Sequence, residues 1–402
     1  MSLSSRINSG FIGLVAANTI LATAMPMLII LGGLAGLELA PNPTLVTLPP
    51  AVQMLAGLMT TAPFAGLMGR YGRKTGFMVG GACAVLGGVM CALAMLQYSF
   101  ILLCFGHMAL GAALACYQYF RFAVAEVVSK EWQPVAISIM LTSGLAAAFS
   151  GPELFIWSRN SIGAAPLAGA YLAISLFSLI GMLPLLMVKS SRPFTKDTRP
   201  GLCLKDKLNA ITRGPILGAI IIGAVSQGIM VLLMSPTPLA MIACGFSEDT
   251  ASDVIRWHVI AMFAPSFVTG LLIKRYGTRR IAILGLLLTL ISAGLAASGL
   301  SLIYFYGSLV ILGIGWNFSI IAATNLIVEA ASDAEKAFVQ GTNNTVIALI
   351  STLFAFGSGA IVSHLGWTIL ASAAIPVLVA SLVYATLMRF EEAPANEGEL
   401  PT

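Results

Sequence analysis

Long apolar stretches alternate with short polar segments along the whole chain. An α-helix needs about 20 apolar residues to cross the hydrocarbon core of a bilayer, and this length recurs many times in the sequence. The pattern predicts twelve membrane-spanning helices, which we place near residues 11–33, 46–68, 76–96, 99–124, 135–157, 166–188, 215–238, 252–273, 280–299, 302–328, 338–363 and 367–388. We therefore expect an all-α polytopic membrane protein.

Composition agrees with this pattern, because 58% of the residues are hydrophobic and 9% are charged. Such a chain is not a soluble globular protein. Its surface partner is the lipid bilayer, and the net charge of +5 follows from the placement of loop cations, so no nucleic-acid partner is indicated. We expect a monomer without a bound cofactor.

Lys and Arg gather in every second polar segment. They follow the second, sixth and eighth spans at Arg70, Arg73, Lys74, residues 189–213, Lys274, Arg275, Arg279 and Arg280. The alternate segments carry few cations, with Arg159 as the exception. The positive-inside rule then places both termini and the central segment in the cytoplasm of a bacterial inner membrane. The first span is longer than a signal-peptide core, and we expect it to be retained.

A short motif occurs twice. Gly-Arg-Tyr-Gly-Arg-Lys at Gly69–Lys74 returns as Lys-Arg-Tyr-Gly-Thr-Arg-Arg at Lys274–Arg280, and the shared Arg-Tyr-Gly is offset by 205 residues. The repeat predicts a duplicated six-helix unit. We expect one bundle over 1–188, a polar linker over 189–213, a second bundle over 214–390 and a disordered acidic tail over 391–402.

Two residue pairs on the seventh and eighth spans combine soft metal ligands. Met230 and Met234 are four residues apart, as are His258 and Met262, so each pair shares one helix face. Thioether sulfur and neutral imidazole suit Cu(I), and Met is cheap to bury in an apolar environment. The two spans should be antiparallel neighbours with the four ligands at matching depths, and Cys244 lies between the pairs.

Chance and packing are the alternatives to a metal site. With 18 Met in the chain, about 0.8 Met pairs at this helical spacing are expected at random, whereas His-Met pairs are expected at about 0.13. Met commonly fills gaps in apolar cores. The coincidence of both pairs therefore carries more weight than the Met pair alone.

Other polar residues in the apolar spans are costly in lipid and should face a central cavity. They are Tyr117, Tyr119 and Arg121 on the fourth span, Trp316 and Asn317 on the tenth, and Asn343 on the eleventh. Aromatic and amide groups of this kind suit a flat heterocycle. Interhelical hydrogen bonding is the simpler alternative, and Arg121 can instead extend toward Glu126.

The repeated basic loop resembles the signature loop of the major facilitator superfamily. Arg70, Gly72 and Arg73 match that pattern in the first copy, and Arg275 and Gly277 match it in the second. Gly69 and Lys274 occupy the position of the family's Asp, which places the usual latch between the two halves in doubt. The resemblance implies two bundles around a cavity lined by spans one, four, seven and ten, with alternating access.

The Met and His pairs resemble the CcoA-like copper-uptake branch of that superfamily, with Cys244 in the place of a flanking Cys. The resemblance implies copper import that supplies the assembly of cbb3-type cytochrome oxidase. The branch also contains RfnT-like members associated with riboflavin. Our leading hypothesis is therefore copper import, with uptake of riboflavin or another planar solute as the alternative.

Two other classes are weaker. Gly151-Pro152 partly resembles the antiporter motif of drug exporters, but Phe155-Ile156 replaces the expected Gly pair, so drug efflux is a lesser alternative. The chain has neither a Gly-x-Ser-x-Gly elbow nor a His-Glu-x-x-His motif, which argues against an enzyme. The remaining alternative function is a sensor that binds its ligand without transporting it.

Overall fold

The fold is entirely α-helical over the residues that the computed structural model describes, which are 8–42, 45, 48–163, 165–188 and 204–387. The first half contains α1 (Ser9–Leu21), α2 (Ala24–Leu39), α3 (Leu48–Tyr71), α4 (Arg73–Gln97), α5 (Phe100–Tyr117), α6 (Phe120–Glu126), η3 (Lys130–Trp132), α7 (Gln133–Ser158), α8 (Ala168–Met182) and η4 (Leu183–Met187). After α9 (Leu204–Thr212), the second half contains α10 (Gly214–Met234), α11 (Thr237–Ala243), α12 (Glu248–Phe263), α13 (Ser266–Tyr276), α14 (Thr278–Ser298), α15 (Leu302–Ala330), α16 (Lys336–Leu365) and α17 (Trp367–Leu387).

The predicted all-α membrane fold is confirmed. Eleven described segments are long and apolar enough to cross a membrane, and α16 is a further 30-residue helix at the position of the eleventh predicted span. The predicted linker contains α9, while 189–203 lies outside the described residues. The predicted tail, 391–402, also lies outside them.

Several predicted spans are broken into two helices. The seventh was expected to run to residue 238, but α10 ends at Met234 and α11 begins after Pro236. The eighth is divided at Pro265, which precedes α13. Proline has no backbone N–H to continue the helical ladder. The fourth span breaks without proline, because the Tyr119 N–H bonds to the Cys116 carbonyl three residues back, at 3.1 Å, in a tight turn.

The internal repeat is visible in the backbone. Gly72 between α3 and α4, and Gly277 between α13 and α14, both have a φ of 88°. This region of φ is strained for residues that carry a Cβ atom. The two glycines make equivalent turns 205 residues apart, so the motif repeat corresponds to a structural repeat.

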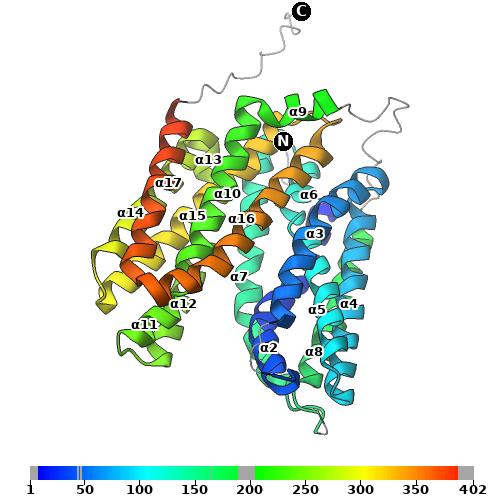
Figure 1. The fold of residues 1–402 in the computed structure, drawn as a ribbon. Coiled ribbons are helices and arrows are strands. Elements are labelled where there is room, and N and C mark those ends of the chain that lie inside the picture. Colours follow the sequence, from blue (N-terminus) through cyan, green and yellow to red (C-terminus); the bar gives the residue numbers. More distant parts are fainter. Residues whose placement is uncertain (1–7, 43–44, 46–47, 164, 189–203, 388–402) are drawn as a thin grey trace, which may run out of the picture.

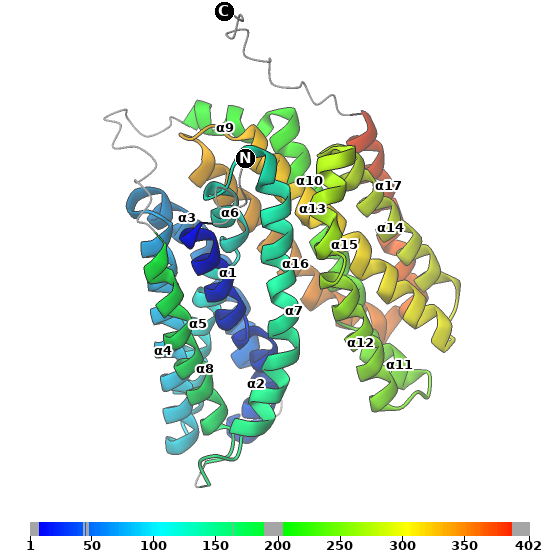
Figure 2. The same cartoon turned by 180° about the vertical axis from the view of Figure 1, so that it is seen from behind.

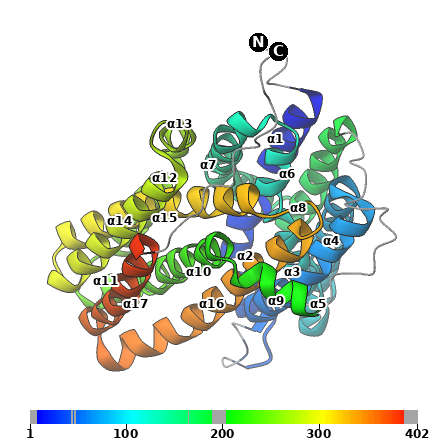
Figure 3. The same cartoon turned by 90° about the horizontal axis from the view of Figure 1, so that it is seen from above.

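The two halves meet mainly through two helix pairs, α3 with α16 and α7 with α13. We call the end of the molecule at which α9 lies the linker end; it is the predicted cytoplasmic end. Both side views show the halves drawing together at the linker end and diverging toward α2 and α11 (Figures 1 and 2). Viewed from above, α15 crosses between α10 and α12 (Figure 3).

Glycines allow the two halves to approach closely at the linker end. A Cβ at Gly270 of α13 would lie 2.5 Å from the Pro134 carbonyl oxygen of α7. A Cβ at Gly341 of α16 would lie 2.8 Å from the Ala65 Cβ of α3. Both distances are shorter than van der Waals contact. The backbone at these positions therefore sets how tightly the linker end can close.

Candidate functional site

Three of the predicted ligands come together with an aromatic residue in the second half. The methionine cluster consists of Met230 of α10, Met262 of α12, and Trp316 and Ile320 of α15, all buried. Met234 is partly buried and packs against the cluster. Thioethers from both predicted pairs are therefore in one place, and an indole ring is among them.

The packing of the helices that carry the methionines differs from the prediction. The seventh and eighth spans were expected to pack directly, but α15 makes the extensive contacts with both α10 and α12. Trp316 of α15 donates its Nε1–H to the Gln227 side chain of α10 at 2.7 Å. Its ring lies edge-on to Phe263 of α12, with centroids 6.0 Å apart. Trp316 thus connects the two helices that carry the methionines.

The first half also reaches this cluster. Leu141 of α7 packs against the methionine cluster. One turn further along α7, a Cβ at Gly144 would lie 2.9 Å from the Phe263 ring. The cluster is therefore at the boundary between the halves.

His258 is fully buried one helical turn from Met262. Its Nδ1 lies 2.7 Å from the Leu309 carbonyl oxygen, and because a carbonyl only accepts, Nδ1 carries the proton. Nε2 is buried without a partner among the described residues. A carbonyl that holds one ring nitrogen and leaves the other free is typical of metal-ligating histidines.

The remaining predicted ligand, Cys244, is exposed directly after α11 and lies outside the methionine cluster. No group of three or more His, Cys, Asp or Glu side chains able to hold a metal occurs among the described residues. A metal ion at the methionine cluster would therefore depend on thioether sulfur and the His258 imidazole.

Asn317 uses its whole amide at the break between α12 and α13. Its Nδ2 donates to the Met262 carbonyl at 2.7 Å and to the Ser266 hydroxyl, and its Oδ1 accepts from Thr269 at 2.7 Å. These bonds satisfy the Met262 carbonyl and two nearby hydroxyl groups at the point where Pro265 interrupts the backbone hydrogen bonds of the helix. Asn317, expected to face a cavity, has the interhelical role that was the simpler alternative.

The two tyrosines of the fourth span are separated by its break. Tyr117 packs within the first half, where its ring would be 3.7 Å from a Cβ at Gly80 of α4. Tyr119 is fully buried, and its hydroxyl donates to the Thr61 carbonyl at 2.7 Å. Neither tyrosine therefore presents its ring to an open central cavity.

The repeated loop has one buried and several exposed cations. Arg70 and Arg275 lie over the rings of Tyr71 and Tyr276, at 5.3 and 5.4 Å from the ring centroids, and both arginines are on the surface or close to it. Arg73 is 3% exposed. Its position thus differs from that of the other loop cations.

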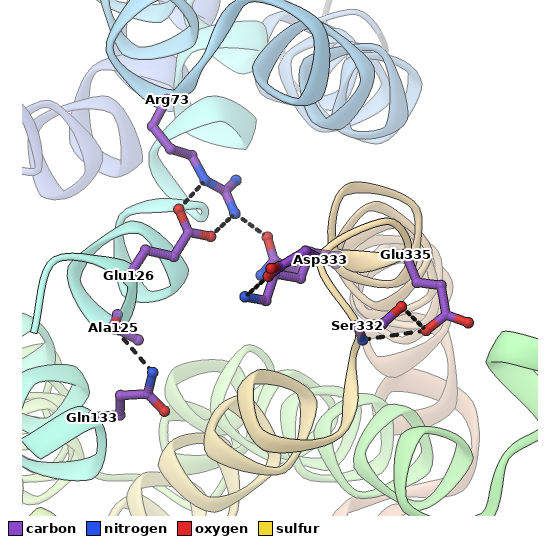
Figure 4. Close-up of polar contacts among 9 residues, drawn as sticks. Arg73, Ala125, Glu126, Gln133, Ser332, Asp333 and Glu335 are labelled. Atoms are coloured by element: carbon purple, nitrogen blue, oxygen red, sulfur yellow. Dashed lines mark hydrogen bonds and ion pairs between the residues drawn. The ribbon is translucent and has the colours of Figure 1, made fainter. Parts of the chain in front are cut away.

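Arg73 forms a bidentate ion pair with Glu126 of α6, with Nη2 at 2.6 Å from Oε1 and Nε at 3.1 Å from Oε2 (Figure 4). Nη2 also donates to the Gln340 side chain of α16. A latch between the halves therefore exists without the family's Asp. Thr278 is the equivalent of Arg73 by the 205-residue offset, and its hydroxyl faces the Glu329 carboxylate at 3.4 Å.

A second polar contact between the halves involves an arginine and two asparagines. We call Arg121 of α6 and Asn343 and Asn344 of α16 the amide cluster. Nη2 of Arg121 donates to Oδ1 of Asn344 at 2.6 Å, and Nδ2 of Asn343 donates to the same oxygen at 3.2 Å. Glu126, toward which Arg121 was alternatively expected to extend, is bound to Arg73.

Sequence reasoning missed Gln227 and Gln340 as partners of predicted site residues. Each is a polar residue within an apolar helix, the same signal that selected the asparagines, and each bonds a residue from a distant part of the chain. Polar residues within the apolar helices α10 and α16 therefore also indicate candidate site residues.

Two halves of membrane-length helices, with polar and thioether side chains buried where they meet, define a polytopic membrane protein built from two helical bundles. The chain is 34% identical over 371 residues to the riboflavin transporter RfnT of Brucella anthropi, covering 92% of this chain and 93% of that one. It is 31% identical to the uncharacterized MFS-type transporter YdeG of Bacillus subtilis, covering 87% and 86%. The chain belongs to the major facilitator superfamily, and the model of that family matches residues 220–402.

Solved structures with low sequence identity share this fold. FucP in the outward conformation superposes with a TM-score of 0.76 at 14% identity, covering 94% of this chain and 97% of that one. A bacterial homologue of the iron transporter ferroportin gives 0.74 at 15%, covering 94% and 98%. The protein is a multi-pass membrane transporter of a small solute, and it is not an enzyme.

Proposed function

We propose that this protein is a secondary transporter that imports riboflavin or a closely related flavin across a bacterial inner membrane. One observation carries the proposal: the similarity to a riboflavin transporter extends over 92% of the chain at 34% identity. An alignment of that length spans both halves of the chain. It supports riboflavin, the alternative hypothesis from sequence, better than it supports copper.

The buried chemistry between the halves is compatible with a flavin. Its isoalloxazine ring is flat and aromatic with a hydrogen-bonding edge, and such ligands are held by aromatic faces and a few placed polar groups. Trp316 and Gln227 supply an indole and an amide in the second half, and the amide cluster joins both halves. Release at the linker end requires the Arg73 and Arg121 contacts with α16 to separate.

The direct test is uptake of labelled riboflavin by vesicles that contain the purified full-length protein. We expect accumulation above that of protein-free vesicles. Trp316→Ala should lower uptake about tenfold or more, as expected for loss of a buried aromatic contact, whereas Trp157→Ala should leave it unchanged because Trp157 is 80% exposed. Absence of flavin uptake by well-folded wild-type protein would refute the proposal.

Copper import is the second candidate, and a specific observation favours it. Met230 and Met262 lie in one cluster with Met234 packed against it. His258, one helical turn from Met262, has Nδ1 bound to a carbonyl and Nε2 without a partner among the described residues. Both ligand types suit Cu(I). On this candidate the imported copper supplies the assembly of cbb3-type cytochrome oxidase.

Radioactive copper uptake in the same vesicles separates the two candidates. If copper is the cargo, Met234→Ala and His258→Ala should reduce its uptake, while Met59→Ala, a change at a 66% exposed position of α3, should not. Equal copper uptake by all three folded variants would exclude this site as the copper path.

A further inference from the structure

The amide cluster leaves a defined set of buried hydrogen-bonding atoms unused. The two bonds within it both end on Oδ1 of Asn344. Nε of Arg121, Nδ2 of Asn344 and Oδ1 of Asn343 are buried without a partner among the described residues. Each of these three atoms belongs to a side chain that takes part in a hydrogen bond at Oδ1 of Asn344. Two donors and one acceptor therefore remain unpaired on the three side chains that meet at Oδ1 of Asn344.

This arrangement is unfavourable as it stands. A buried donor or acceptor without a partner costs about 1–3 kcal/mol, and a buried charge without a counter-ion costs more. Arg121 is 9% exposed, and the ion pairs found among the described residues involve other cations. A ligand that pairs all three atoms would recover this free energy.

We propose that the amide cluster binds the imide edge of the transported heterocycle, the sequence C(=O)–NH–C(=O). This inference rests on the proposed flavin function. An imide offers two acceptors and one donor, the complement of the unused atoms. Its carbonyl oxygens accept from Arg121 Nε and Asn344 Nδ2, and its N–H donates to Asn343 Oδ1. The isoalloxazine ring carries such an edge at N3, whereas the ribityl chain does not.

The position of the cluster gives this recognition a role in transport. Arg121 is on α6 of the first half, and both asparagines are on α16 of the second. A ligand bound to all three holds the halves together at the linker end. A ligand shifts a conformational equilibrium only by its differential affinity for the two states. The imide edge therefore favours the state in which α6 and α16 are close.

Gly223 of α10 lies beside the acceptor. A Cβ added there would be 3.5 Å from Oδ1 of Asn343 and 3.2 Å from the Ile347 side chain. A larger residue at this position would therefore crowd Asn343.

The test compares the binding of riboflavin and N3-methylriboflavin to the purified full-length protein by isothermal titration calorimetry. Methylation removes the N–H donor and leaves the ring and the ribityl chain unchanged. Wild-type protein should bind riboflavin about tenfold more tightly, because the methylated ligand leaves Asn343 Oδ1 unpaired. In Asn343→Leu the preference should fall to about twofold or less. Thr352→Val, on the same helix and with its hydroxyl bonded to the Ala348 carbonyl at 2.8 Å, should retain the wild-type ratio.

The outcomes separate the inference from the function. Wild-type protein that binds neither flavin overturns the proposed function and the inference together. Binding of riboflavin with no preference over the methylated analogue overturns the inference alone, whether or not the variants fold. An equal preference in wild type and in folded Asn343→Leu overturns it as well. A preference that disappears in Asn343→Leu and persists in Thr352→Val supports it.

Discussion

Replacing Gly270 by alanine should shift the protein away from the state that is closed at the linker end. The added Cβ would lie 2.5 Å from the Pro134 carbonyl oxygen and 2.6 Å from the Val135 Cα. An ordinary carbon–oxygen contact is about 3.3–3.6 Å, so α7 and α13 must separate by about 1 Å. Both obstructing atoms are backbone, and neither can turn aside as a side chain would.

The cost falls on the closed state because α7 and α13 belong to different halves. Overpacking of this kind costs about 1–3 kcal/mol, which corresponds to a change of about 5- to 150-fold in the ratio of open to closed molecules. The separation also stretches the 3.0 Å hydrogen bond from the Gly270 N–H to the Ser138 hydroxyl. The expected result is therefore a population opened at the linker end.

Pulsed electron paramagnetic resonance can measure this population. The labels are spin-labelled unnatural amino acids that replace Thr75 of α4 and Arg280 of α14. Both positions are exposed, and they belong to different halves. Gly270→Ala should add a longer distance to the distribution. Gly285→Ala is the matched control, because its Cβ would lie 2.6 Å from the Ser319 backbone nitrogen within one half; it should lower stability without lengthening the distance. Identical distributions for wild type and folded Gly270→Ala would refute the reasoning.

Three further predictions concern the loops and the second pair of contact helices. Gly277→Ala should lower thermal stability by about 1–2 kcal/mol, since alanine is strained at a φ of 88°; an unchanged melting temperature would contradict this. Gly341→Ala should impair uptake, and Ala65→Gly in the same chain should restore it, because the two Cβ atoms would be 2.8 Å apart; failure of the rescue would exclude simple steric conflict. A hydrogen bond from Lys336 lowers the pKa of Asp333, so its small stabilising effect is present at neutral pH and lost as pH falls through the lowered pKa. The difference in melting temperature between wild type and Asp333→Asn should therefore shrink on acidification, and a growing difference would be inconsistent with that sign.

The sequence was sufficient for the fold because the bilayer imposes a strong and simple pattern. Helix length and apolar composition identify membrane spans almost independently of packing. The repeated Arg-Tyr-Gly also reported a true structural repeat, since Gly72 and Gly277 need the same unusual φ. Helix breaks were less predictable. Those at Pro236 and Pro265 had a local signal, whereas the turn at Tyr119 depends on a single shifted hydrogen bond.

Side-chain directions within the spans could not be predicted from the sequence. Cost in lipid indicates that a polar residue avoids the bilayer, but a cavity and a hydrogen bond to another helix satisfy that requirement equally. Asn317 and Tyr117 were grouped with Arg121 for this reason, yet Asn317 is fully hydrogen-bonded at a helix break. The order of helices around the bundle was also needed, because α15 lies between the methionines of α10 and Met262 of α12.

The contact of α7 with the methionine cluster carries a mechanical consequence. Leu141 and Gly144 touch cluster residues or Phe263, so a cargo that enlarges the volume near Trp316 pushes directly against the opposite half. A broad solute that fits beside Trp316 better when the halves are apart would then favour the open arrangement, and a narrow one would not.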